Sequence, residues 1–212
     1  MEPAEDDVRA AWRRLPGAHS LVGDEVVEDL LARHREPERR YHTATHVMWV
    51  VRHVEELLPA VGDAIDRDAV VAAALFHDAI YDPRSATNEA DSAALASEQL
   101  ARLEWPQQRI DSVASLIEST AGHVASDPAA AVLLDADLAI LGAPADAYRE
   151  YVASVRQEYA FVTDEQWHSG RSAILHGFLD RPSIYVTPAM VAQREEQARI
   201  NIAAELDALL TK

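Results

Sequence analysis

Two adjacent residues, His77 and Asp78, close an apolar, alanine-rich stretch of the chain that reads AVVAAALFHDAIYD. A histidine and a carboxylate are costly to bury without a partner, and together they are typical ligands for a metal ion. Another histidine, His46, lies upstream in YHTATHV, and Asp137 lies downstream in LLDADLAILG. The order of these residues predicts metal-assisted hydrolysis by a protein built from helices.

Two aspartates, Asp135 and Asp137, fall within one apolar segment, but only one of them can face a given ion. Residues two apart on a helix lie about 200° apart around its axis, so the other aspartate orients a neighbour or caps a helix. His46, His77 and Asp78 with one of these aspartates give two imidazoles and two carboxylates. This set suits manganese, iron, cobalt, nickel or zinc better than calcium, and magnesium is a further candidate. It leaves positions on the ion for a water and a phosphate oxygen.

Helical periodicity runs along most of the chain and predicts the elements that position these residues. We expect an all-α protein with about nine to ten helices in a single domain over residues 1–212, with no linker that separates two domains. The helices that matter most are expected over 45–58 (stopped by Pro59), from Asp66 or Asp68 to about residue 80, over 88–103, from Asp127-Pro128 to Gly142, and from a capping box at Thr163 and Gln166 through Leu179.

The composition narrows the classes of function. The chain has 212 residues, a formal net charge of −17 and no cysteine. Any metal must therefore be held by nitrogen and oxygen atoms rather than by thiolates. The acidic charge argues against long nucleic acid as a partner, because such binding needs a basic surface. The sequence has no apolar run of about 18 residues and no signal-peptide core, so we expect a cytoplasmic protein without a membrane partner.

Several polar residues near these motifs are candidates for catalysis. Asp78 itself, or Asp82 or Glu89 around the loop after the doublet, is predicted to position the water or to act as general base. Asp82 has an alternative role, because an aspartate before Pro83 also initiates a turn.

Other residues are candidates for substrate binding. Arg39 and Arg84 are predicted to contact phosphate, because the guanidinium fork matches phosphate oxygens. His42 and His123 are predicted to touch the substrate or a second ion. The alternatives are an ordinary N-terminal cap for His42 and an interaction with the helix dipole for His123.

The motifs RRYHTATHV, LFHDAIYDP followed by TNEADSA, LLDADLAILG, VRQEY and EEQARINIAAEL occur in this order over about residues 36–205. Together they resemble the HD-domain superfamily, and more narrowly a small bacterial branch of predicted metal-dependent HD phosphohydrolases. The resemblance implies an HD-type helical domain with a metal held by His46, His77, Asp78 and Asp137. It also implies that Asp137, which follows an alanine as in the family, is the ligand. Asp135 would then support the site without binding the metal directly.

The sequence and the resemblance together predict a phosphohydrolase that uses a metal-activated water on a small phosphorylated metabolite, a nucleotide above all. Two alternatives stay open, because the superfamily includes both: a di-iron HD-type oxygenase, and a non-catalytic HD-fold sensor that binds nucleotides. Assembly as a homodimer is also left open.

Overall fold

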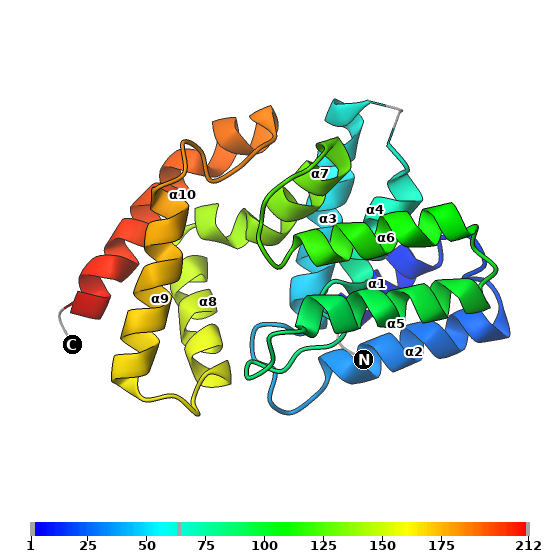
Figure 1. Cartoon of the computed structure of the whole chain (residues 1–212), viewed down its shortest axis with the longest axis horizontal. Helices are drawn as coiled ribbons and strands as arrows, with labels where there is room; N and C mark the ends of the chain where they lie inside the picture. The colour runs from blue at the N-terminus through cyan, green and yellow to red at the C-terminus, as the bar shows by residue number, and fades with distance from the viewer. Residues whose placement is uncertain (1–2, 63–64, 211–212) are drawn as a thin grey trace. The chain divides into compact units, whose positions relative to one another are not determined.

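The structure is a computed structural model that describes residues 3–62 and 65–210 (Figure 1). Within these residues the chain forms ten α-helices and one 3-10 helix, without a strand, which confirms the predicted all-α fold class. The elements are α1 (Pro3–Trp12), α2 (Leu21–His34), α3 (Ala44–Val61), α4 (Arg67–Phe76), α5 (Asn88–Arg102), α6 (Gln107–Ser119), α7 (Pro128–Asp137), the 3-10 helix η1 (Leu138–Gly142), α8 (Ala145–Glu158), α9 (Asp164–Leu179) and α10 (Pro188–Leu210).

The chain divides into two compact units, residues 1–136 and 137–212. The boundary falls within α7, one residue before that helix ends. Nine of the ten residues of α7 therefore belong to the first unit, and Asp137 is placed as the last residue of this helix. The single domain expected over 1–212 stays a prediction.

The core of the first unit is built around α4, which packs against α1, α3, α5 and α6. Every residue of α4 from Ala69 to Phe76 is buried. A helix that is apolar on all sides is stable only when neighbours cover all of it. The small alanines let those neighbours approach, and the burial of α4 carries the chain directly to His77.

Three predicted helix starts are confirmed by side-chain caps. Asp66 accepts a hydrogen bond from the backbone N–H of Ala69, and Asp127 accepts one from that of Ala130. Thr163 and Gln166 form the reciprocal bonds of a capping box at the start of α9. Each cap satisfies a backbone N–H that has no partner inside the helix.

Pro59 does not stop α3, contrary to the prediction from the sequence. The helix continues to Val61 and ends at Gly62, whose φ of 87° lies in the left-handed region that favours glycine. Pro59 is exposed and lies in the last turn, so its missing N–H removes only one hydrogen bond at the helix end.

The predicted boundaries of two other helices also need correction. α4 ends at Phe76, not near residue 80, because the chain turns away and the N–H of Ile80 donates to Oγ of Ser92 at 3.0 Å. The segment expected as one helix up to Gly142 is α7 up to Asp137 and then the tighter η1. His77 and Asp78 therefore lie just beyond a helix end rather than within a helix.

In the second unit, a side chain of α10 is hydrogen-bonded to main-chain carbonyl groups at the end of η1. Nδ2 of Asn201 donates to the carbonyl oxygens of Leu141 and Ala143, each at 2.8 Å. A Cβ atom at Gly142 would lie 2.6 Å from Cβ of Arg194, so this close approach requires glycine. The turn that follows Asp137 is thus fixed by residues far along the chain.

A second buried network in this unit joins α9 and α10. Nε and Nη2 of Arg171 donate to the two carboxylate oxygens of Glu205 at 2.8 and 3.1 Å. The side chains of this pair are only 7% and 5% exposed. A bidentate pair of this kind satisfies both charges inside the fold.

In the part of the chain that the structure describes, no single helix is long and apolar enough to cross a membrane. One bent helix pair, Pro128–Gly142 with Ala145–Glu158, passes the test of length and composition, which buried core helices also pass.

Candidate metal centre

Two buried histidines present one ring nitrogen each to a common point. His46 lies in the first turn of α3 and is 4% exposed, and His77 caps the C-terminus of α4 and is 2% exposed. Nδ1 of His77 lies 2.9 Å from the carbonyl oxygen of Ala74. Because a carbonyl only accepts, Nδ1 carries the proton, and Nε2 of the neutral ring offers a lone pair.

The carboxylate of Asp78 completes a compact set of three donor atoms. Nε2 of His46 lies 3.1 Å from Nε2 of His77, and Oδ2 of Asp78 lies 3.2 and 3.1 Å from these two nitrogens. Ligands about 2.1 Å from one ion and at right angles to each other are about 3 Å apart. The donor set therefore fits the coordination of a single divalent ion.

Asp137, the last residue of α7, offers a further carboxylate. Its donor atom and those of His46 and His77 all lie within 4.8 Å of one another, and no other such group occurs among the described residues. Asp135, which is 1% exposed, is outside this group, and so is Asp78 despite its contacts with both imidazoles. This geometry favours Asp137 over Asp135 as the ligand from α7.

The surroundings of Asp78 favour its ionised form. Burial by itself raises the pKa of this carboxyl group, and its side chain is 19% exposed. Electrostatic interactions with the imidazoles of His77 and His42 and hydrogen bonds with His46 and His77 outweigh that effect and hold the pKa of Asp78 well below its usual range. A carboxylate that stays charged beside two imidazoles is suited to bind a cation.

Two aromatic rings lie beside His46, and a third stacks on one of them. The ring centroid of Tyr41 lies 4.8 Å from that of His46, and the centroid of His42 lies 5.6 Å from it. His42 in turn stacks on Tyr81 at 4.0 Å. The structure thus brings the ring of His42 next to that of His46, and its predicted contact with the substrate stays a prediction. Tyr81 was not predicted as a site residue, because it reaches His42 from the irregular segment after α4.

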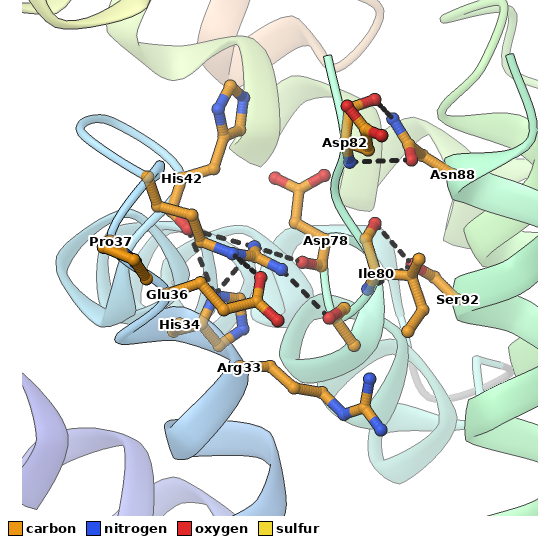
Figure 2. A network of polar contacts seen from close by, with 12 residues as sticks. Arg33, His34, Glu36, Pro37, His42, Asp78, Ile80, Asp82, Asn88 and Ser92 are labelled. Carbon is orange, nitrogen blue, oxygen red and sulfur yellow. Dashed lines mark hydrogen bonds and ion pairs between the residues drawn. The ribbon is translucent and has the colours of Figure 1, made fainter. Parts of the chain in front are cut away.

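Asp82 forms a turn, which was its predicted alternative role. Its carboxylate accepts from the backbone N–H of Arg84 at 2.9 Å, and its backbone N–H and C=O pair with the side-chain amide of Asn88 at 3.0 and 2.9 Å (Figure 2). The side chain is 57% exposed. A role for Asp82 as general base stays a prediction.

The structure gives Arg39 a different task from the predicted phosphate contact. Its side chain is 1% exposed, and its guanidinium group donates to main-chain carbonyl oxygens, including those of His42 and Asp78. In Figure 2 the ring of His42 and the carboxylate of Asp78 project to the same side, away from these carbonyl groups.

The remaining predicted site residues are spread over two segments. Glu89 lies half-buried in the first turn of α5, and Arg84 is exposed in the preceding loop, 3.8 Å from the carboxylate of Asp82. His123 lies between α6 and α7 with a φ of 47° and is not a member of the His46, His77 and Asp137 group. The predicted roles of all three stay predictions.

Comparison with known protein families gives one match. The model of the HD domain matches residues 43–142, from the start of α3 to the end of η1. A search of curated proteins and a search of solved structures each found no match. The matched region contains the two histidines and both aspartates of the candidate metal centre. The helical fold and the His-His-Asp group agree with this match, and residues 43–142 form an HD domain.

Proposed function

We propose that the protein is a metal-dependent phosphohydrolase that acts on a small phosphorylated metabolite, with nucleotides as the favoured substrates. The observation that carries this proposal is the approach of two imidazole nitrogens and a carboxylate oxygen to 3.1–3.2 Å of one another. HD-domain proteins typically use such a centre to hydrolyse phosphoesters. The narrower bacterial branch suggested by the sequence motifs is part of the same proposal.

The donor set indicates what each residue contributes. A divalent ion held by His46, His77, Asp78 and Asp137 would acidify a coordinated water and withdraw charge from a phosphoryl oxygen. The mixture of nitrogen and oxygen donors suits manganese, iron, cobalt, nickel or zinc.

The carboxylates divide into two groups under this proposal. Asp78 keeps its charge because of the neighbouring imidazoles, so it serves better to bind a cation than to accept a proton. Either Asp82 or Glu89 would then take the proton of the attacking water. The hydrogen bond from the N–H of Arg84 holds the carboxylate of Asp82 in a defined position for this role.

The aromatic rings beside the centre support a nucleotide as substrate. Tyr41, His42 and Tyr81 offer planar surfaces next to His46, and such surfaces favour the stacking of a base. His42, Arg84 and His123 are the residues proposed to contact the substrate. Their side chains can donate hydrogen bonds to a phosphate, whereas the carboxylates of Asp78 and Asp137 only accept them.

The test is phosphate release by protein that has been stripped of metal and reloaded with manganese, cobalt, nickel or zinc. The substrates are a panel of nucleoside phosphates and sugar phosphates. Wild-type protein is expected to hydrolyse nucleotides, and Asp137→Asn and His77→Gln are expected to lose this activity. His53→Gln is the matched control, because His53 lies on α3 with His46 but its Nδ1 contacts the carboxylate of Glu56.

Three results would contradict the proposal or redirect it. A folded, metal-loaded protein that releases no phosphate from any substrate would contradict it. Elemental analysis that finds two irons in each chain would instead favour the oxygenase alternative. Thermal stabilisation by a nucleotide that is never hydrolysed would favour a sensor. Sedimentation analysis of the same sample tests the homodimer, which stays a prediction.

A further inference from the structure

Three of the four proposed metal ligands come from two separate segments of the first unit. His46 follows the connector between α2 and α3, and His77 and Asp78 follow α4. The ligands His46 and His77 are 31 residues apart in the sequence, yet their Nε2 atoms lie 3.1 Å apart. The connector before α3 and the segment after α4 lie outside helices, so contacts between them help to set how the ligands of the two segments meet.

Arg39 is bonded to both segments at once. Its Nη1 donates to the carbonyl oxygen of Asp78 at 2.7 Å and to that of His42 at 3.2 Å. Its Nη2 donates to the carbonyl oxygen of Ala79 at 3.1 Å. One guanidinium group therefore ties the main chain four residues before His46 to the main chain of a proposed ligand.

The surroundings of Arg39 keep this guanidinium group in place. Nε donates to the carboxylate of Glu36 at 3.0 Å, and the guanidinium carbon lies 5.5 Å from the centre of the Tyr81 ring. Nδ1 of His34 lies 3.2 Å from the same His42 carbonyl oxygen that Arg39 binds. Figure 2 shows His34, Glu36 and His42 around these contacts.

A buried arginine contributes little net stability to a fold. Taking a cation out of water costs free energy that its partners only partly return, and apolar side chains of similar volume often stabilise as well or better. The planar fork of a guanidinium group, in contrast, can bind several carbonyl oxygens with fixed directions. A lysine ammonium group, with all its protons on one atom, cannot reproduce this bridge.

We propose that Arg39 is a positioning residue for the metal centre, fixing the main chain of Asp78 relative to His42 so that the Asp78 carboxylate meets the imidazole of His46. The inference rests on the proposed function in taking this cluster as a metal centre. Replacing a residue that orients a metal ligand without binding the metal itself typically weakens metal affinity by about 10- to 100-fold.

The first experiment measures the dissociation constant of manganese or cobalt by titration calorimetry on the full chain. Arg39→Lys and Arg39→Gln are expected to weaken metal binding about 10- to 100-fold, with the stronger loss in the glutamine variant, which keeps no charge. Arg171→Lys is the matched control: Arg171 is also a buried arginine, but it is bonded to Glu205 in the second unit. It is expected to lose thermal stability without a change in metal affinity.

The second experiment needs no metal. Hydrogen exchange of the backbone amides of residues 77–80 in metal-free protein is expected to be faster in Arg39→Lys than in wild type, and unchanged in Arg171→Lys. A folded Arg39→Lys protein with wild-type metal affinity and wild-type exchange at 77–80 would overturn the inference. A metal-loaded protein that hydrolyses no phosphoester, but whose metal affinity still depends on Arg39, would overturn the proposed function and leave the inference standing.

Discussion

The Nε2 atoms of His46 and His77 lie 3.1 Å apart although the two residues are 31 positions apart in the sequence. His77 has its Nδ1 proton on the carbonyl oxygen of Ala74, so its Nε2 is an acceptor that faces a second imidazole. One cation would bind the two buried nitrogens and the charged oxygen of Asp78 at this separation. The predictions on metal binding follow from this relationship.

Binding of a divalent ion is expected to stabilise the fold. An ion that binds only the folded chain raises the free energy of unfolding by about 2.7 kcal/mol at a metal concentration of 100 times Kd. Thermal unfolding in manganese, cobalt, nickel or zinc, compared with unfolding in a chelator, measures this gain. Equal melting temperatures with and without every one of these ions would show that the cluster does not hold a metal.

Replacement of a ligand is expected to remove that gain. His46→Ala should weaken metal binding by more than the roughly 100-fold that loss of an outer partner costs, because it removes a donor atom itself. His53→Ala, about two turns further along α3, should bind metal as wild type does. Calorimetric titration of both variants provides the measurement, and equal dissociation constants for the two would contradict the assignment of His46.

Protonation of His34 is expected to destabilise the protein in acid. Burial, followed by the charge of Arg39, lowers the pKa of His34 to about 3, and Nε2 is a buried atom without a hydrogen-bond partner among the described residues. The unfolded chain takes up this proton near pH 6.5. The stability from keeping His34 neutral is therefore present above pH 6.5 and is lost as the pH falls toward 3, by about 2 kcal/mol between pH 7 and pH 5.

Urea unfolding at pH 7 and pH 5 measures this loss. His34→Asn removes the titrating ring but keeps a donor for the carbonyl oxygen of His42, so the variant should lose about 2 kcal/mol less than wild type over this range. His19→Asn, a substitution of an exposed histidine, should follow the wild-type dependence. If His34→Asn and wild type lose equal stability, His34 is not held neutral by the fold.

Replacement of Asn201 is expected to loosen the turn after Asp137. Asn201→Leu has similar volume but leaves the buried carbonyl oxygens of Leu141 and Ala143 without their donor, which should cost about 2–4 kcal/mol of unfolding free energy. Gln197→Leu removes only the bond that Asn201 accepts, and it should cost less than about 1 kcal/mol. Chemical denaturation of both variants checks the difference, and equal losses would contradict the role given to Asn201.

Much of the secondary structure could be predicted from local patterns. An aspartate two or three residues before an apolar run, as at Asp66 and Asp127, identifies a helix start because its carboxylate satisfies a nearby N–H. The helix ends were less predictable. Pro59 removed one bond at an exposed end, and α4 stopped early because Ser92, twelve residues away, accepts the N–H of Ile80.

The residue types available for a metal could be identified from the sequence: His46, His77 with Asp78, and one of two aspartates near the end of an apolar segment. The folded chain adds the geometry: a donor atom of Asp137 lies within 4.8 Å of those of His46 and His77, and Arg39 binds the main-chain carbonyl oxygen of Asp78. The physical reason is the range of the interactions. Periodicity and capping act within a few residues, whereas the carbonyl oxygen that Arg39 binds at Asp78 lies 39 positions along the chain.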